Sequence, residues 1–319
     1  MAGSSVSSAP VSSPAAPRVL VGPRPARFAT DAVEAGGGRV VAAEEQPEAV
    51  VWLDPRDMAG LASLLQELPT VRWVQLPFAG VERAVEAGLI DPARRWSCAK
   101  GAYAEPVAEH ALALALGGLR RLPERARASS WGEQGGISLY DQPVCIVGGG
   151  GIAQALLGLL APFRARATVV RRRPDPVPGA ERVLRPDRLH DAVADALVVV
   201  LCLALTPETR GLVDESVLRA MRPDAWLVNV ARGGHVVTDD LVRALEEGWI
   251  GGAALDVTDP EPLPEGHPLW QLPTCLITPH TADTWEMIRP LLARRVQENV
   301  ARFARGEPLV GEVDPSAGY

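Results

Sequence analysis

Lysine is almost absent from this 319-residue sequence, in which Lys100 is the one lysine among 32 basic side chains. Alanine, glycine and proline are abundant, a composition typical of the codon bias of a GC-rich genome. We therefore draw no functional conclusion from the arginine content as such. The net charge of -7 argues against nucleic acid as a main partner, because proteins that bind nucleic acids carry a basic surface.

Cysteines and long apolar runs are also scarce. The four cysteines lie in separate, strand-like apolar runs, with no CxxC spacing: Cys98, Cys145, Cys202 and Cys275. This excludes a disulfide scaffold, argues against a cysteine metal site, and predicts reduced, buried thiols in a cytoplasmic protein. No apolar run approaches the roughly 18 residues of a membrane span, so no membrane partner is predicted. Residues 1–17 are rich in Ser, Ala and Pro, which predicts a disordered tail rather than a signal peptide.

Short apolar runs alternate with helical patterns along the chain, which predicts an α/β fold with parallel sheets. The length allows two domains of ordinary size. Strands are predicted at 18–22, 39–42, 49–53, 71–76, 96–99, 144–147, 166–170, 196–203, 225–230, 250–257 and 275–278. Helices are predicted at 26–35, 58–68 with Asp57 as N-cap, 105–121, 152–160 and 287–306, and the tail from 309 is expected to pack back onto the first unit.

The central motif is a glycine turn. A buried apolar strand, 144–147, runs into four glycines and then into an apolar helix. Gly148, Gly150 and Ala153 fit the pattern Gly-x-Gly-x-x-Ala, in which the glycines allow a tight turn and close approach of a pyrophosphate. The start of the helix presents free N–H groups to phosphate. We interpret the motif as a dinucleotide site; the alternative is a flexible glycine loop.

The helix from Glu105 is apolar on most sides, so we expect it to be buried between two units. His110 lies on this helix and is interpreted as a core or helix-contact histidine. The other three histidines outside the motifs, His190, His235 and His267, are predicted to lie on the surface or in loops.

Three predicted strands each end in one candidate catalytic residue: Arg232 after LVNVA, Glu261 after LDVTDP and His280 after LITP. Taken singly, these are ordinary: a helix-start arginine, a loop carboxylate and a histidine after a proline. Ligands of doubly wound sheets bind at the carboxyl ends of strands, so the combination with the glycine turn predicts a site. A metal cluster on the acidic loop around Glu261 is disfavoured because its interleaved prolines make that loop rigid and extended.

Further motifs, in order and spacing, resemble the D-isomer-specific 2-hydroxyacid dehydrogenases of the glyoxylate/hydroxypyruvate reductase kind. They are AGV at Ala79, VAEHALAL at Val107, LTPETRG at Leu205, VNVARGG at Val228, AALDVTDPEPLP at Ala253 and TPHTA at Thr278. The resemblance implies two Rossmann-like domains: a doubly wound NAD(P)-binding domain over 104–286, and a discontinuous flavodoxin-like substrate domain from 18–103 and 287–319. It also implies a cytoplasmic homodimer, with the helix from Val107 near the interface.

The resemblance implies that His280 is the acid/base, Glu261 its partner and Arg232 the substrate anchor. Reduction of a 2-keto acid needs a hydride on the carbonyl carbon and a proton on its oxygen, and imidazolium beside a carboxylate suits the second task. The paired donors of Arg232 suit a carboxylate and a carbonyl oxygen. Backbone N–H groups of Ala79, Gly80 and Val81 are expected to hold the substrate carboxylate. The expected cofactor contacts are Gly148, Gly150, Gly151, Ile152, Arg171, Arg172, Leu203, Val230, Ala231 and Asp256, the last on the nicotinamide amide.

The predicted cofactor is NADP(H), with NAD possible. Enzymes that use NAD place Asp or Glu roughly 20 residues after the glycines to bind the ribose hydroxyls, and here Arg171 occupies that place. A guanidinium binds a 2′-phosphate through paired, charge-assisted hydrogen bonds; the alternative is a solvated basic turn. Leu203 and Ala204 replace a His-x-Pro-like stretch of the family. The competing functions are a cofactor-sensing, weakly catalytic or non-catalytic binding protein on the same scaffold and, less favoured, a methyltransferase.

Overall fold

The computed structural model describes residues 15–314, so nearly all of the tail predicted over 1–17 lies outside the described residues. The chain divides into two compact units. Of the described residues, the first unit contains 15–100 and 289–314, and the second is Gly101–Ile288. Among the described residues, none of the helices has the length and apolar character needed to cross a membrane.

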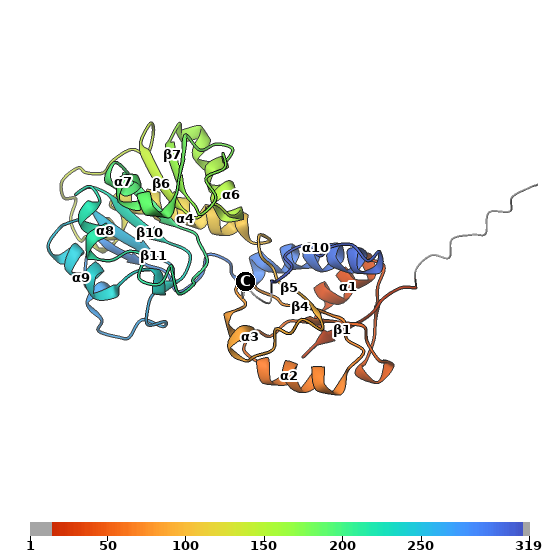
Figure 1. Ribbon diagram of the computed structural model, residues 1–319. Coiled ribbons are helices and arrows are strands. Elements are labelled where there is room, and N and C mark those ends of the chain that lie inside the picture. Colours follow the sequence, from red (N-terminus) through yellow and green to blue (C-terminus); the bar gives the residue numbers. More distant parts are fainter. Residues whose placement is uncertain (1–14, 315–319) are drawn as a thin grey trace, which may run out of the picture. The chain divides into compact units, whose positions relative to one another are not determined.

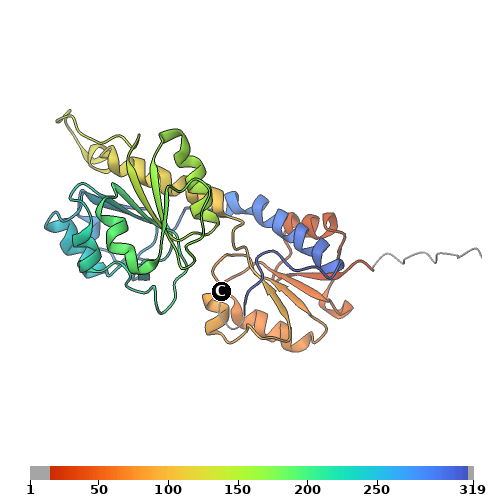
Figure 2. The same ribbon diagram turned by 45° about the horizontal axis from the view of Figure 1, so that its top comes forward.

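The first unit is built on a five-stranded parallel sheet in the order β2-β1-β3-β4-β5. Its strands are β1 (Arg18–Gly22), β2 (Arg39–Val40), β3 (Ala49–Trp52), β4 (Trp73–Gln75) and β5 (Arg95–Ser97). Its helices are α1 (Arg27–Ala35), α2 (Met58–Glu67), α3 (Glu82–Glu86) and most of α10 (Trp285–Ala304). Helices α1 and α10 lie together on one face and α2 lies on the other (Figures 1 and 2). Asp57 caps α2 as predicted, because its carboxylate accepts from the Gly60 N–H at 2.8 Å.

Buried polar side chains tie the C-terminal part of the chain to this sheet. Gln75, Ser97 and Asn299 are all fully buried. The Asn299 amide donates to Gln75 Oε1 at 2.9 Å and to the Val310 carbonyl at 2.9 Å, and Asn299 Oδ1 accepts from the Val310 N–H at 2.8 Å. The Val313 N–H donates to the Trp96 carbonyl, so the segment from 309 to 314 packs on the first unit as predicted.

The second unit is a seven-stranded parallel sheet in the order β12-β11-β10-β9-β6-β7-β8. Its strands are β6 (Pro143–Val147), β7 (Arg166–Val170), β8 (Arg182–Leu184), β9 (Val198–Leu201), β10 (Trp226–Asn229), β11 (Gly252–Leu255) and β12 (Cys275–Ile277). Its helices are α4 (Ala104–Leu119), α5 (Leu122–Arg127), α6 (Gly151–Leu160), α7 (Leu189–Ala194), α8 (Glu215–Ala220) and α9 (Thr238–Glu246). The chain leaves β6 in one direction and returns beside it with β9, so the strand order reverses between them.

Helix α4 is buried by packing within the second unit, where it contacts α6, β10 and β11. Its expected position between the two units stays a prediction. Its glycines allow the close approach, because a Cβ at Gly118 would lie 2.2 Å from the Trp226 ring. The helix also ends earlier than predicted: Arg121 adopts a left-handed φ of 54° and starts α5.

Candidate active site

The three candidate catalytic residues follow three adjacent strands. Strands β10, β11 and β12 are parallel neighbours, and Asn229 pairs in register with Leu255, which pairs with Ile277. Their carboxyl ends therefore lie at one edge of the sheet. Arg232 follows the first, Glu261 the second and His280 the third, so the fold of the second unit places all three at that edge.

His280 and Glu261 form a direct pair, with Nδ1 of the ring 2.7 Å from Oε1 of the carboxylate. Both side chains are about half exposed, at 42% and 43%. His280 has a left-handed φ of 50°, which is uncommon for a residue with a Cβ and indicates a conformation imposed by its surroundings. Because Glu261 engages Nδ1, Nε2 is the ring nitrogen placed to exchange a proton with a ligand.

The turn that carries His280 is organised by Asp256, whose side chain is only 1% exposed. Its carboxylate accepts from the Thr278 hydroxyl at 2.6 Å and from the N–H groups of Thr281 and Ala282 at 2.9 and 3.1 Å. His110 Nε2 lies 3.3 Å from the same carboxylate. Burial alone would raise the pKa of Asp256, but the hydrogen bonds from His110, Thr278 and the two N–H groups outweigh it and hold the pKa at about 2.

Arg232 sits on a turn that is fixed from both sides. The buried amide of Asn229 accepts from the Ala231 N–H at 3.0 Å and donates to the Arg232 carbonyl at 2.9 Å. Gly233 touches the loop after β11 so closely that a Cβ there would lie 1.9 Å from the Thr258 carbonyl oxygen. These contacts hold the backbone around Arg232 against the loop that leads to Glu261. Val230 and Ala231, expected near the cofactor, are both buried here.

Asp283 is a residue of this site that the motif reading missed. Burial raises the pKa of its carboxyl; the charges of His280 and Arg232 oppose that rise and the charge of Asp256 adds to it. Its position three residues beyond His280, directly after the TPHTA motif, was the available signal. The Asp283 carboxyl therefore interacts electrostatically with His280 and Arg232, the two side chains that would meet an anionic substrate.

The glycine turn between β6 and α6 has the geometry of a phosphate cradle. Gly148 has a φ of 115°, and a Cβ there would lie 2.4 Å from the Cys202 carbonyl oxygen, so only glycine fits. A Cβ at Gly150 would meet no atom within 4 Å, which leaves open space in front of the helix. The N-cap residue Gly150 has no side chain to cap α6, so the N–H groups at the start of this helix, which begins at Gly151 and Ile152, can take a phosphate as their acceptor. Ala153 is fully buried, as close packing of helix and strand demands.

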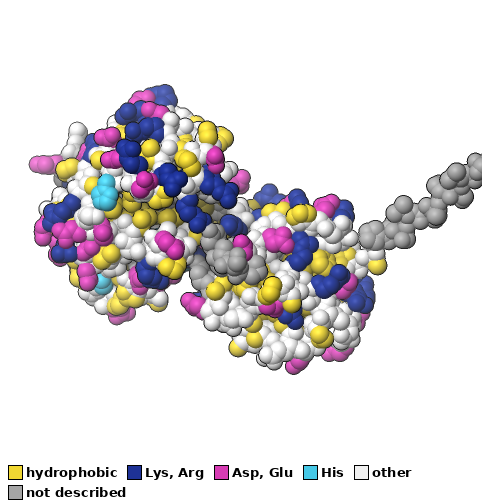
Figure 3. All heavy atoms as spheres, viewed as in Figure 1, with side chains coloured by type: hydrophobic (Ala, Val, Ile, Leu, Met, Phe, Trp, Pro, Cys, Tyr) yellow, Lys and Arg dark blue, Asp and Glu magenta, His cyan; other side chains and the backbone are white. Residues whose placement is uncertain are grey.

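Arg171 lies over this turn. A Cβ at Gly149 would be 2.8 Å from Arg171 Cδ, so the arginine side chain folds back across the glycines from the end of β7. Arg171 is half-buried, whereas Arg172, Arg173 and Asp175 are exposed. Basic side chains gather over the part of the second unit that carries α6 and β7 (Figures 1 and 3). The structure therefore places the Arg171 side chain against the turn, whereas the Asp175 carboxylate is exposed.

His235 corrects one expectation, because it is fully buried rather than on the surface. Its Nδ1 lies 3.0 Å from the Thr209 carbonyl oxygen and its Nε2 lies 3.2 Å from the Leu203 carbonyl oxygen. It thus holds the loop after β9, on which the expected cofactor contact Leu203 lies. The sequence pattern after VNVARGG does not distinguish this buried histidine from a loop residue.

The remaining predicted residues belong to the first unit or make other contacts within the second. Ala79, Gly80 and Val81 belong to the first unit, between β4 and α3. His190 is exposed on α7, and His267 accepts from the Leu269 N–H at a helix start. All four cysteines are buried and none is in a disulfide, as predicted, and burial raises the pKa of Cys145, Cys202 and Cys275 to about 12. Within residues 15–314, His, Cys, Asp and Glu side chains form no group of three or more that could hold a metal.

Comparison with known proteins identifies the family. Residues 110–282 match the model of the NAD binding domain of D-isomer specific 2-hydroxyacid dehydrogenases. An uncharacterised protein of Corynebacterium melassecola is 40% identical over 297 residues, which cover 91% of this chain and 96% of that protein. Human glyoxylate reductase/hydroxypyruvate reductase is 35% identical over 218 residues, 66% of each chain.

The solved structures agree. A D-isomer specific 2-hydroxyacid dehydrogenase from Xanthobacter autotrophicus Py2, in complex with NADPH and MES, superposes with a TM-score of 0.82 at 27% identity. The match covers 96% of this chain and all of that one. The two-sheet fold of this chain thus matches that of a solved D-isomer specific 2-hydroxyacid dehydrogenase. The chain belongs to the D-isomer specific 2-hydroxyacid dehydrogenase family, whose members are NAD(P)-dependent.

Proposed function

We propose that the protein is an NADP(H)-preferring reductase that converts small 2-keto acids, such as glyoxylate or hydroxypyruvate, to D-2-hydroxy acids. The observation that carries this proposal is the 2.7 Å pair of His280 and Glu261, at the same sheet edge as Arg232. A protonated imidazole held by a carboxylate can deliver a proton to a carbonyl oxygen. The name of the human relative, glyoxylate reductase/hydroxypyruvate reductase, supports the substrate class.

Each residue of the site has one task in this proposal. A bound nicotinamide cofactor would supply the hydride, with its pyrophosphate held at Gly148–Ile152. Glu261 orients the His280 ring through Nδ1, and Nε2 gives the proton to the developing alkoxide. The Arg232 guanidinium binds the substrate carboxylate and polarises the carbonyl. The assignment of Ala79, Gly80 and Val81 to the same carboxylate rests on the sequence resemblance.

The preference for NADP(H) rests on Arg171. Its side chain lies across the glycine turn, where a cation would attract a 2′-phosphate. The Xanthobacter relative was solved with NADPH, which supports the proposal. Arg171→Asp is expected to shift the ratio of kcat/KM values toward NADH. Arg173→Asp is the matched control, because it makes the same charge change at an exposed position two residues away.

One experiment tests the activity itself: a panel of 2-keto acids assayed with both NADPH and NADH. We expect turnover of glyoxylate or hydroxypyruvate, with the higher kcat/KM for NADPH. Cofactor binding without turnover of any 2-keto acid would favour the cofactor-sensing binding protein instead. Equal or better efficiency with NADH would remove the role assigned to Arg171.

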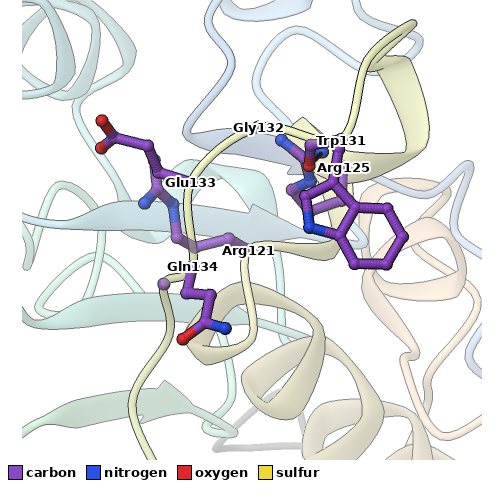
Figure 4. Close-up of a pocket in the computed structure, with 7 residues that line it drawn as sticks. Arg121, Arg125, Trp131, Gly132, Glu133 and Gln134 are labelled. Carbon is purple, nitrogen blue, oxygen red and sulfur yellow. Dashed lines mark hydrogen bonds between the residues drawn. The ribbon is translucent and has the colours of Figure 1, made fainter.

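We also propose that the protein is a cytoplasmic homodimer associated through its second units. The loop after α5 presents Trp131 with 94% of its surface exposed. Arg125 donates to the carbonyls of Ser130 and Trp131, and Figure 4 shows the Arg125 side chain beside Trp131 and Gly132. An exposed indole and the nearby exposed Leu122 are the kind of surface that a second copy would cover. Sedimentation at micromolar concentration tests this; a monomer would contradict it.

A further inference from the structure

We propose that His110 and Thr278 are positioning residues for the proton donor, acting through Asp256 on the turn that carries His280. The inference rests on the proposed acid/base role of His280 and adds two residues to the machinery of that reaction. His110 comes from α4, far from the catalytic residues in sequence, and its Nε2 lies 3.0 Å from the Thr278 hydroxyl and 3.3 Å from the Asp256 carboxylate.

The hydrogen bonds that link His110, Thr278 and Asp256 have a defined direction. Asp256 accepts at both carboxylate oxygens, so the Thr278 hydroxyl must donate its hydrogen to Oδ1 at 2.6 Å. The Thr278 oxygen is then an acceptor toward His110, and Nε2 of His110 must carry a hydrogen. The order is therefore His110 to Thr278 to Asp256, with each donor aimed toward the carboxylate.

Asp256 in turn binds three consecutive backbone N–H groups. Its carbonyl oxygen accepts from the His280 N–H at 2.8 Å, and its carboxylate accepts from the next two residues, Thr281 and Ala282. These bonds hold the chain in the left-handed turn at His280, a conformation that the peptide disfavours when free. If the carboxylate turns away, the imidazole loses its position relative to Glu261 and to a substrate.

The burial of Asp256 favours this role over a direct cofactor contact as the main task of its carboxylate. The side chain is 1% exposed, and both of its oxygens already accept hydrogen bonds from protein groups. The two roles predict different kinetic signatures. A positioning role affects kcat, whereas a contact with the nicotinamide amide affects cofactor affinity.

Paired substitutions separate these roles. Thr278→Val removes the hydroxyl at constant shape, and Thr278→Ser retains it. His110→Leu removes the donor, and His110→Gln places an amide N–H near the position of Nε2. We expect Thr278→Val and His110→Leu each to lower kcat about 10- to 100-fold, since small displacements of a reacting group are costly. We expect KM for the keto acid and the NADPH dissociation constant to stay within about threefold, with Ser and Gln restoring most of kcat.

Three results would overturn the proposal: unchanged kcat in the Val and Leu variants, equal losses in the Ser and Gln variants, or a loss confined to NADPH affinity. Hydrogen exchange of the amides at 280–282 gives a readout that does not need catalysis. It should accelerate in Thr278→Val and not in Thr278→Ser. If the wild-type protein reduces no 2-keto acid, the proposed function fails, and this exchange measurement still decides whether His110 and Thr278 hold the turn.

Discussion

The two units of the molecule place their polar side chains differently. In the first unit, Gln75, Ser97 and Asn299 are fully buried and hydrogen-bond to one another and to the C-terminal segment. In the second unit, strands β9 and β11 are apolar throughout, and the candidate catalytic side chains come after the strands end, at Arg232 and His280. A polar network inside a sheet stabilises the fold, whereas polar groups beyond strand ends are available to a ligand.

Because of this difference, we expect substitutions in the polar network of the first unit to change stability, and substitutions at the strand ends of the second unit to change catalysis. Loss of a buried polar partner in the first unit leaves other buried groups unsatisfied, which lowers the free energy of unfolding. Loss of a half-exposed residue in the second unit removes chemistry at little structural cost. The following substitutions test that separation, from the largest expected effect to the smallest.

His280→Ala is expected to lower kcat for 2-keto acid reduction by about 10²- to 10⁴-fold, because the proton donor is lost. NADPH affinity and the melting temperature should stay close to those of the wild type, since the ring is 42% exposed. His190→Ala, at an exposed histidine on α7, is the control. Near-normal turnover of the His280 variant would remove the acid/base role.

Asn299→Ala is expected to lower the free energy of unfolding by about 2–3 kcal/mol, because it leaves buried partners in the Gln75 and Val310 backbone network without their hydrogen bonds. The kcat of the folded protein should stay near wild type. Glu298→Ala, which removes only a surface pair with Arg302, is the control and should change stability by less than about 0.5 kcal/mol. Chemical denaturation measures both; similar values for the two variants would contradict the prediction.

Glu261→Gln is expected to lower kcat about 10- to 100-fold, because the charged carboxylate that orients the His280 ring is replaced by a neutral amide. The contact at stake is the one between Glu261 Oε1 and Nδ1 of the ring, at 2.7 Å. Glu265→Gln changes an exposed carboxylate of the same loop and serves as the control. A kcat equal to that of the wild type would exclude the orienting role of Glu261.

His235→Gln is expected to flatten the dependence of stability on pH. Burial is the main cause that lowers the pKa of His235, with Arg232 and Arg210 acting in the same direction and the Thr209 and Leu203 carbonyls opposing them. The folded state therefore binds this proton more weakly than the unfolded state, so its contribution is present above about pH 6.5 and is lost as the pH falls below that value. The expected difference between pH 7 and pH 5 is about 1 kcal/mol or less. Melting curves of wild type, His235→Gln and the control His190→Gln measure it, and parallel curves would contradict it.

Much of the fold follows from local patterns in the sequence. Apolar runs such as Val144–Val147 and Val198–Leu201 became central strands because such runs fit only a sheet covered on both faces. The short helices α7 and α8, six residues each, were not predicted because they are too short for a periodic signal. Strand β8 was missed for the same reason.

Site residues that belong to a sequence motif could be predicted. Residues whose role depends on a partner distant in sequence could not. The motifs located His280, Glu261 and Arg232, and the structure brings them to one edge. His110 was interpreted as a core or helix contact, but its hydrogen bond reaches Thr278, 168 residues away in sequence. Burial of His235 and Asp283 likewise depends on contacts that no local pattern reports.

The buried thiols can report the unfolding of each unit separately. Cys98 lies in the first unit and the other three cysteines lie in the second, and all are shielded from solvent. A thiolate is the reactive form, and burial holds Cys145 and Cys202 with a pKa of about 12, so alkylating reagents label them only after the central strands open. Mass spectrometry of each alkylated peptide would then time the opening of the two units separately, in one sample and without an engineered labelling site.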